Sequence, residues 1–521
     1  MSFFSRLTFL GRFTIIGIIT AIVCAILYFT GIMSGCTENS KNKEGQSLPS
    51  LSSLTKKSKY DATLVVNPYT GFAPIVWGNG GLEPKDDSYF AKKYGLKLKV
   101  IVMDDFDAAR SALKNDDAQI EYCTLDALPV EMSSSGTMTD MKYFMLLNFS
   151  AGADALVANA TINQISDLKG KRVAYAEGTA SHTLLINALE TSSLTMDDII
   201  PVKVSSGVDA AQAFKAKQVD CAAVWSPDDV DCINAFKGAH LLTSTAQSNM
   251  LVSDGLIAKK EWLEKNKNLA AKIVEAILAA NAEVTNNKTA FNEAAQIFAK
   301  EFETDVDFAL ASSSTINYAS LDDQINWMGL NSDYSGMTGE RIYSKMSRIY
   351  SGLGLCKSVL PWSKAAYTDI VELVNEKNSL TPEQKKSVGT AEKTFTAPTV
   401  KEDTVKAFSN KKVTINFPVN GFTLDNEARA TIDREFVDIV QSYANTRIRI
   451  EGNTDATGNY NSNVSLSKKR AQAVVDYLTN EYKINRNRFV VVGNGPKHAI
   501  EDGVKESNES YRTTDLQLIA Q

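Results

Sequence analysis

Strand-like and helical segments alternate from residue 61 to about residue 256, after which the chain is mostly helical, and this alternation is the strongest constraint on the fold. Short apolar or β-branched runs bounded by turn residues predict strands, at 62–66, 96–102, 119–123, 154–158, 172–175, 200–204 and 221–224. Amphipathic segments between and after them predict helices, at 107–114, 181–190, 208–215, 269–286 and 290–301. The pattern indicates α/β layers with largely parallel sheet, in which ligands bind beyond the C-terminal ends of the strands.

Loops at these strand ends supply candidate solute contacts. The loop 177–182 joins a strand to a helix, so its backbone N–H groups, the positive helix end and the hydroxyls of Thr179 and Ser181 could hold an anionic head group. Other candidate contacts come from loops that follow strands or from the helix that begins here: Tyr69, Thr70, Phe72, Thr124, His182 and Trp225.

Structural roles explain several of these candidates equally well. Ser181 could simply cap the helix, His182 could be a packing residue, and Trp225 could belong to the core. Asp154 is a further candidate contact, but its carboxylate would oppose an anion and could pair with an amine or cap a strand. The loop 177–182 predicts a small, anionic solute. Asp154 argues against an anion, so the charge of the solute stays open.

Residues 152–225 resemble periplasmic substrate-binding proteins of the aliphatic sulfonate, taurine and nitrate class. The matching elements are Asp167-Leu-Lys-Gly-Lys-Arg-Val173, Gly178-Thr-Ala-Ser-His182, and Val219-Asp220 before Trp225-Ser-Pro227. The resemblance implies a type II periplasmic-binding fold over residues 60–377, in which two α/β lobes close on a small molecule by hinge motion.

A polar segment at 378–404, which could hold one short helix, is predicted to link this region to a second domain at 405–521. Alternating apolar and polar runs in the second domain predict strands at 413–417, 447–450, 489–492 and 515–518. Amphipathic helices are expected at 424–443 and 466–482, which gives a βαβαββ order and an α+β fold.

The segment Glu451-Gly-Asn-Thr-Asp-Ala-Thr-Gly458, with Leu466-Ser467 and Arg470-Ala471, is similar to the peptidoglycan-binding domain of the OmpA, Pal and MotB family. The resemblance implies that Asp455 and Arg470 grip the ammonium and carboxylate of diaminopimelate in the wall peptide. The residues implied to frame the groove are Thr454, Asn463 and Ser467.

This segment departs from the family pattern in two places. Asn453 replaces the usual histidine, and the closing Asn-Arg-Arg motif is reduced to Tyr511-Arg512-Thr513, which lacks the second arginine. A purely structural Asp–Arg ion pair, in a domain that no longer binds the wall, is therefore the alternative interpretation.

The N-terminal segment sets the expected compartment. Residues 13–33 are uncharged over 21 positions, enough to span a bilayer as a helix, and Arg6 and Arg12 before them favour a cytoplasmic N-terminus. Residues 1–36 are thus predicted as a single-pass anchor in the cytoplasmic membrane, 37–59 as a flexible tether, and the bulk as periplasmic. The alternative is a lipoprotein anchored at Cys36, because Met33-Ser-Gly-Cys36 resembles a lipobox.

Composition excludes several classes of function. With 55 Lys and Arg against 61 Asp and Glu, the net charge of −6 offers no basic excess for nucleic acid. Three histidines and six scattered cysteines argue against a metal centre, and no cofactor is expected. Whether Cys221 and Cys232 form a disulfide stays an open question. No nucleophile–base set is evident, so no catalytic residue is expected.

The parts together predict a non-enzymatic envelope protein, a scaffold or sensor that binds a solute and peptidoglycan. The alternative is a wall-tethered receptor that delivers its solute to a membrane permease of the ABC class.

Overall fold

The computed structural model describes residues 59–519 except 134, 135, 137, 249, 387–393 and 419. The expected membrane anchor at 13–33, the lipobox with Cys36 and nearly all of the tether at 37–59 lie outside the described residues. Within the described part of the chain, none of the helices combines the length and the apolar character needed to cross a bilayer.

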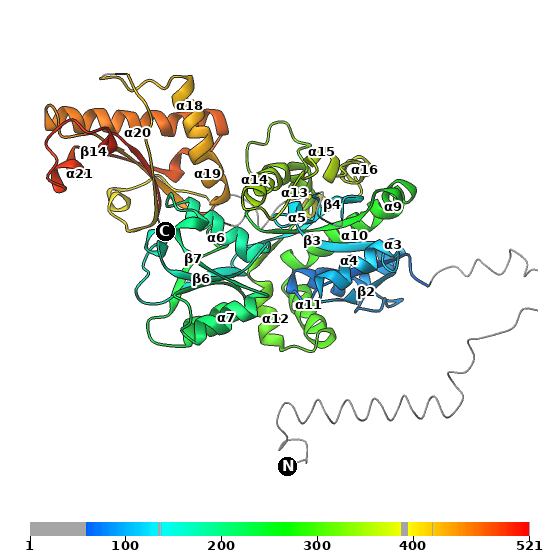
Figure 1. The fold of residues 1–521 in the computed structure, drawn as a ribbon. Coiled ribbons are helices and arrows are strands. Elements are labelled where there is room, and N and C mark those ends of the chain that lie inside the picture. The colour runs from blue at the N-terminus through cyan, green and yellow to red at the C-terminus, as the bar shows by residue number, and fades with distance from the viewer. Residues whose placement is uncertain are drawn as a thin grey trace, which may run out of the picture. The chain divides into compact units, whose positions relative to one another are not determined.

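The first lobe is built on a six-stranded mixed sheet (Figure 1). Its strands are β1 (Ala62–Val66), β2 (Leu98–Val102), β3 (Ile120–Thr124), β4 (Met141–Ser150), β10 (Ser253–Lys259) and β11 (Ile316–Tyr318), in the order β11-β4-β10-β3-β1-β2. Strands β1, β2 and β3 are parallel, whereas β10 runs antiparallel to both β3 and β4.

The second lobe has a five-stranded sheet of order β7-β6-β8-β5-β9. Its strands are β5 (Asp154–Ala158), β6 (Arg172–Ala176), β7 (Ile200–Val204), β8 (Cys221–Trp225) and β9 (His240–Ser244). The expectation of largely parallel sheets is wrong in both lobes. The chain enters the second lobe through β4 and β5 and returns through β9 and β10, and these crossing strands pair antiparallel with their neighbours.

Helices cover the sheets of both lobes. Those before the crossing back to the first lobe are α2 (Ala73–Asn79), α3 (Tyr89–Tyr94), α4 (Phe106–Lys114), α5 (Leu128–Glu131), α6 (Ala180–Glu190), α7 (Gly207–Lys215) and α8 (Asp228–Asn234). Those after it are α9 (Lys260–Lys265), α10 (Lys267–Asn286), α11 (Lys288–Glu301), α12 (Val306–Ser313), α13 (Leu321–Trp327), α14 (Gly339–Gly352), α15 (Trp362–Ala365) and α16 (Asp369–Lys377). The short α17 (Pro382–Lys385) follows within the expected linker.

Cys221 and Cys232 are separate buried thiols, so the disulfide that the sequence left open is not formed. They belong to different hydrophobic clusters, Cys221 to the large core of the lobes and Cys232 to a smaller core beneath α7 and α8. The Cys232 thiol instead lies 3.8 Å from the carbonyl oxygen of Ala211.

The C-terminal domain has a four-stranded sheet of order β12-β15-β13-β14. Its strands are β12 (Ala407–Val413), β13 (Arg447–Asn453), β14 (Phe489–Gly495) and β15 (Thr514–Ile519), and its helices are α18 (Asn426–Ile432), α19 (Asp438–Ser442), α20 (Tyr460–Tyr482) and α21 (Lys497–Glu501). A π-helical turn at Asp433–Val437 joins α18 to α19 without a break, so the three segments correspond to the single helix predicted at 424–443. The first strand ends at Val413, where the sequence predicted it to begin.

Gly452 sets how closely β13 can approach α20. A Cβ atom at this position would stand 2.1 Å from the Ser467 carbonyl oxygen, a backbone atom that cannot move aside alone. We expect Gly452→Ala to lower the free energy of unfolding by about 1–3 kcal/mol in denaturant titrations, because overpacking forces the two elements apart. Gly352→Ala is the matched control, since nothing lies within 4 Å of its Cβ position. Equal stability of the two variants would contradict this account of the packing.

Candidate functional sites

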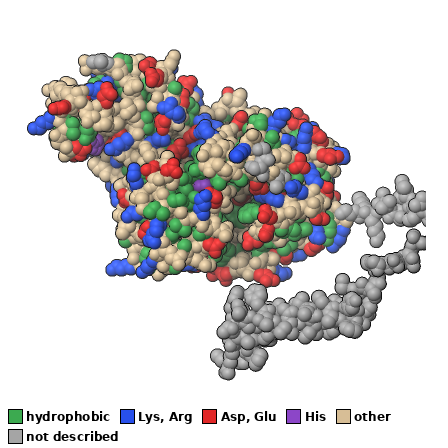
Figure 2. Space-filling view, viewed as in Figure 1, with side chains coloured by type: hydrophobic (Ala, Val, Ile, Leu, Met, Phe, Trp, Pro, Cys, Tyr) green, Lys and Arg blue, Asp and Glu red, His purple; other side chains and the backbone are tan. Residues whose placement is uncertain are grey.

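Three carboxyl groups come together where the two lobes meet. Asp126 follows β3, Asp254 lies near the start of β10, and Asp154 begins β5. Asp126 and Asp154 are buried, whereas Asp254 is half-buried. Figure 2 shows the lobes hollowed between them on the visible face, with hydrophobic side chains lining the recess.

Strand pairing fixes the surroundings of Asp254. Its neighbours across the sheet are Thr124 of β3 and Asn148 of β4, so all three side chains lie on one face. The Thr124 hydroxyl donates to Asp254 Oδ1 at 3.2 Å. The Asn148 amide nitrogen donates to the Gly71 carbonyl at 3.4 Å, while its Oδ1 is buried without a hydrogen-bond partner.

The environment raises the pKa of each of these carboxyls. Burial is the largest cause in every case and brings the pKa of Asp126 to about 7, that of Asp154 to about 6 and that of Asp254 to about 8. Mutual repulsion adds to the effect, because Asp154 and Asp126 both raise the pKa of Asp254. The cluster therefore resists accumulating negative charge unless a counter-charge enters.

The loop after β1 provides one wall of this cleft. Tyr69 faces Asp254 and Asp154, and burial followed by these two carboxyls raises the pKa of its hydroxyl. Its ring meets that of Phe72 edge-on at 6.0 Å. Thr70 is buried and turned away into the protein, where its hydroxyl lies 2.7 Å from that of Ser312.

The loop before α6 holds the groups that were expected to bind an anion. Two of its donors already have partners, because the Gly178 N–H donates to His182 Nδ1 at 3.2 Å and the Thr179 hydroxyl donates to the Ala176 carbonyl at 2.8 Å. Ser181 is not a helix cap, since α6 begins at Ala180 with Thr179 in the cap position. The Ser181 hydroxyl is instead buried without a hydrogen-bond partner.

His182 is a neutral packing residue with one unused nitrogen. It is buried, stacks on the Tyr175 ring at 4.6 Å, and burial lowers its pKa to about 4. Because Nδ1 accepts from Gly178, the proton sits on Nε2, which has no partner. Trp225 is half-buried and its ring packs on Gly207 at the start of α7.

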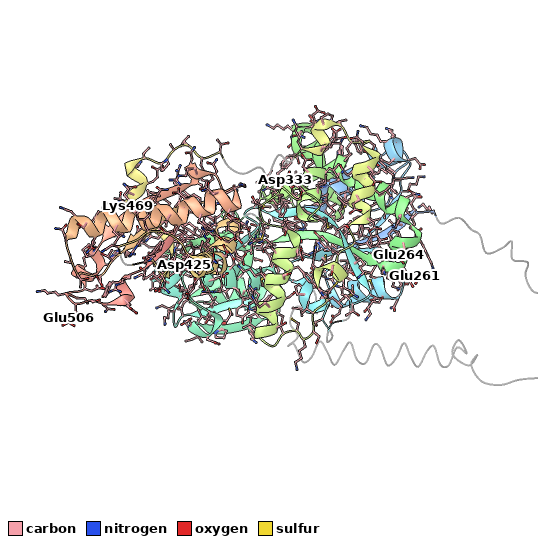
Figure 3. All side chains as sticks on the ribbon, turned by 90° about the horizontal axis from the view of Figure 1, so that it is seen from above. Glu261, Glu264, Asp333, Asp425, Lys469 and Glu506 are labelled. Atoms are coloured by element: carbon pink, nitrogen blue, oxygen red, sulfur yellow. The ribbon has the colours of Figure 1, made fainter. Side chains whose placement is uncertain are left out.

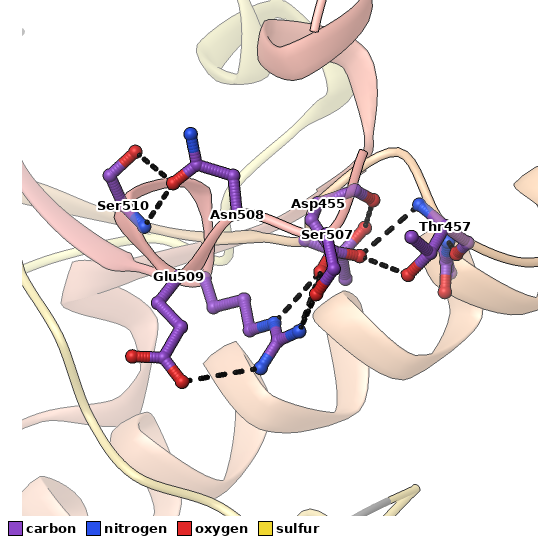
Figure 4. Close-up of polar contacts among 9 residues, drawn as sticks. Asp455, Thr457, Ser507, Asn508, Glu509 and Ser510 are labelled. Atoms are coloured by element: carbon purple, nitrogen blue, oxygen red, sulfur yellow. Dashed lines mark hydrogen bonds and ion pairs between the residues drawn. The ribbon is translucent and has the colours of Figure 1, made fainter. Parts of the chain in front are cut away.

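In the C-terminal domain, the carboxylate of Asp455 is the centre of a hydrogen-bonded group (Figure 4). It accepts from the Thr457 hydroxyl at 2.6 Å and the Thr457 N–H at 3.2 Å, and it forms an ion pair with Arg512 at 2.8 Å. The Ser507 hydroxyl donates to it at 3.3 Å. Burial opposes ionisation, but the bonds from Thr457 and Arg512 hold the pKa of Asp455 below its ordinary value.

Arg470 lies beside this group without an ion pair to Asp455. Its guanidinium donates to the carbonyls of Gly421 at 3.0 Å and Pro418 at 3.3 Å, and it stands 5.0 Å from the centre of the Phe417 ring. Burial and, second, the neighbouring Arg512 cation lower the pKa of Arg470. The next residue, Lys469 (Figure 3), stands over the Phe422 ring.

The three residues expected to frame the groove have structural partners. The Asn463 side chain donates to the Thr457 carbonyl at 2.7 Å, which ties α20 to the loop that carries Asp455. Ser467 is buried and accepts from the Gly495 N–H at 2.9 Å, and Thr454 is buried with its N–H on the Gly495 carbonyl at 2.8 Å. These contacts position the loop.

Sequence reasoning missed four residues that the structure brings to these sites. Asp254 and Asn148 lie on strands that were not predicted, although the run Val252-Ser-Asp-Gly-Leu-Ile-Ala258 carries a strand-like signal. Asp126 was not among the candidate contacts, and Arg512 was considered only as the remnant of the closing motif. No local pattern marks either of them as a partner of Asp254 or Asp455.

Comparison with known families gives two matches in this chain. Residues 89–290 match the family described as NMT1/THI5 like, and residues 416–513 match the OmpA family. A putative aliphatic sulfonates-binding protein of Escherichia coli is 41% identical over 69 residues, which are 13% of this chain and 21% of the relative. Outer membrane porin F of Pseudomonas aeruginosa is 36% identical over 69 residues, 13% of this chain and 20% of the relative.

The matched segments therefore span about a fifth of each of these two relatives. Among solved structures, the periplasmic aliphatic sulphonate binding protein SsuA of Escherichia coli superposes with a TM-score of 0.48 at 17% identity, over 60% of this chain and 99% of that one.

Proposed function

We propose that this chain, in which an NMT1/THI5-like domain is joined to a C-terminal domain of the OmpA family, is a non-enzymatic protein of the bacterial cell envelope that binds a small solute and peptidoglycan. The observation that carries solute binding is the set of buried polar atoms without partners between the lobes. They include both oxygens of Asp126, Oδ1 of Asn148 and the Ser181 hydroxyl. Leaving such groups unpaired is costly, so a bound molecule that satisfies them is expected.

Peptidoglycan binding rests on Asp455 and Arg470. Asp455 is held ionised at the end of β13, and Arg470 presents a second charge from α20 that contacts two backbone carbonyls and the Phe417 ring and, among the described residues, forms no ion pair. A zwitterionic diaminopimelate could place its ammonium on Asp455 and its carboxylate on Arg470. In this proposal Arg512 orients Asp455 in the free domain, and Thr454, Asn463 and Ser467 hold the loop.

The proposed localisation follows from the N-terminal sequence. An anchor at 13–33 would leave the lobes and the wall-binding domain in the periplasm, with a tether at 37–59 between membrane and lobes. Lipid attachment at Cys36 is the alternative and would also keep the bulk of the chain outside the cytoplasmic membrane.

Two roles fit this arrangement. The first is a scaffold or sensor that samples a solute while fixed to membrane and wall. The second is a receptor for an ABC permease, and the similarity to a putative aliphatic sulfonates-binding protein favours it. Co-purification with a membrane permease would support the second role and contradict the first.

Native mass spectrometry of residues 59–521, which form one compact unit, tests solute binding. We expect a non-covalent small molecule to co-purify with the protein and to be lost on denaturation. Asn148→Ala should reduce its occupancy about tenfold or more, because it removes a buried contact. Asn266→Ala is the control, because the Asn266 side chain donates to the Trp262 carbonyl at the C-terminal end of α9, at 2.9 Å. If no small molecule co-purifies and none from a metabolite library binds, the proposed function fails.

A further inference from the structure

We propose that the solute is an organic cation of the ammonium or amidinium type, held by the carboxyl groups of Asp126, Asp154 and Asp254. The inference rests on the proposed solute-binding function and names the class of solute. The loop 177–182 suggested an anionic solute, whereas Asp154 had left the charge of the solute open. The present proposal assigns a positive charge to the solute.

The first support is the absence of counter-charge. Among the residues that the structure describes, none of the three carboxyls forms an ion pair with lysine or arginine. The titratable groups that interact electrostatically with these carboxyls include further acids, among them Tyr69, Tyr122, Asp229 and Tyr350. The nearby cation Arg110 is already bound by Glu121 and Glu131.

The second support is a row of acceptors on one face of the first sheet. Thr124, Asp254 and Asn148 are successive cross-strand neighbours, and the Thr124 hydroxyl already uses its proton on Asp254. Asn148 is fully buried, and its Oδ1, a pure acceptor, has no partner. A ligand that satisfies this atom and Asp254 must bring N–H or O–H donors.

Asp126 extends the acceptor set toward the second lobe. The polar groups nearest its carboxyl are the Thr183 hydroxyl and the N–H groups of Asp126 and Ser253, yet neither oxygen has a hydrogen bond of normal geometry. Thr183 belongs to α6 and shares a 2.8 Å hydrogen bond with Tyr350. An oxyanion at the start of α6 would therefore lie near a buried carboxyl, while two of the loop donors are already used.

Ammonium and amidinium groups match this site in three respects. They carry several N–H donors and no acceptor, they supply the missing charge, and the bonds they form to carboxylates are charge-assisted. An aromatic ring adds a favourable surface for a cation, and Tyr69 forms one wall, with the fully buried Phe72 packed behind it. Entry of the cation favours the ionised carboxylates, so binding releases protons from groups whose pKa values lie between about 6 and 8.

Titration calorimetry of residues 59–521 with two matched pairs of probes tests the proposal. The pairs are butylammonium with butane-1-sulfonate and benzamidinium with benzenesulfonate, so shape is kept while charge is reversed. We expect the cations to bind, with an affinity that rises from pH 5.5 to pH 8.5 as the carboxyls ionise. Asp254→Asn and Asp126→Asn should each weaken binding about tenfold to a hundredfold. Asp87→Asn, an exposed carboxylate of the same lobe, should not change it.

The outcomes separate this inference from the proposed function. Binding of the sulfonates without the cations would overturn the cation proposal and leave solute binding intact. Binding of neither class at any pH would overturn the cation proposal, and the test of solute binding would remain the co-purification and library experiment. Cation binding unchanged in Asp254→Asn and Asp126→Asn would place the site elsewhere and overturn the assignment. The comparison of probe pairs needs only the wild-type chain, so it stands even if a variant fails to fold.

Discussion

Asp455→Ala and Arg470→Ala are each expected to abolish co-sedimentation of residues 59–521 with diaminopimelate-type peptidoglycan. Each change leaves one charge of the zwitterionic ligand without its counterpart. The loss of a charge-assisted hydrogen bond costs about 1.5–3 kcal/mol, which corresponds to roughly a tenfold to hundredfold loss of affinity. Arg512→Ala should also weaken binding, because it removes the ion pair that orients the Asp455 carboxylate.

Asp476→Ala is the matched control for this experiment. Asp476 is an exposed carboxylate of α20, the helix that carries Arg470, and its partner is Arg486 on the surface. Its loss should leave sedimentation unchanged. If both Asp455→Ala and Arg470→Ala still sediment with the wall, binding lies elsewhere on the domain. If the wild type does not sediment, the Asp455–Arg512 pair is structural, and the loss of the second arginine of the closing motif becomes the explanation.

Arg110→Met should produce the largest loss of stability, about 3–5 kcal/mol in the free energy of unfolding. The guanidinium is buried, forms ion pairs with Glu121 and Glu131, and donates to the Tyr122 carbonyl at 3.1 Å. Glu121 is fully buried, so removal of the cation leaves a carboxyl in the core without its partner. Urea unfolding followed by circular dichroism measures the difference.

The pH dependence of the Arg110→Met defect identifies its cause. Burial raises the pKa of Glu121 to about 7, and Arg110 opposes that rise. Without Arg110 the pKa of Glu121 in the folded chain lies above this value, so the folded variant keeps the proton at pH values where the folded wild type releases it, and the stability of the variant falls further than that of the wild type as pH rises above about 7. The deficit relative to wild type should therefore be smaller at pH 5 than at pH 8.

Arg172→Met is the control for burial. Arg172 pairs with Asp220 at 3.3 Å, but its side chain is 47% exposed, and such pairs contribute about 0–1 kcal/mol. A similar loss of stability in both variants, or a deficit that does not change with pH, would contradict the explanation through Glu121.

The sequence by itself determined which segments form most of the strands and helices. Strands β1, β5 and β7 have the predicted bounds, and α10 begins two residues earlier than predicted and ends where predicted. Hydrophobic periodicity is a local property of the chain and reports which face of an element is buried. Strand β4 was not predicted from the sequence, because nearly all of its residues are buried and it therefore lacks the alternation of apolar and polar residues that marks a half-buried strand.

The candidate sites, too, depend partly on local sequence and partly on contacts between distant segments. A local motif located Asp455 and Arg470, since a strand-end loop and the helix that follows it are close in sequence. Only the tertiary structure brought Arg512 to Asp455 across 57 positions, and Asp254 to Thr124 across 130. Strand pairing between distant segments decides which side chains share a face, and burial then decides their charge. The charge of the proposed solute cleft is thus fixed by contacts that no local pattern in the sequence encodes.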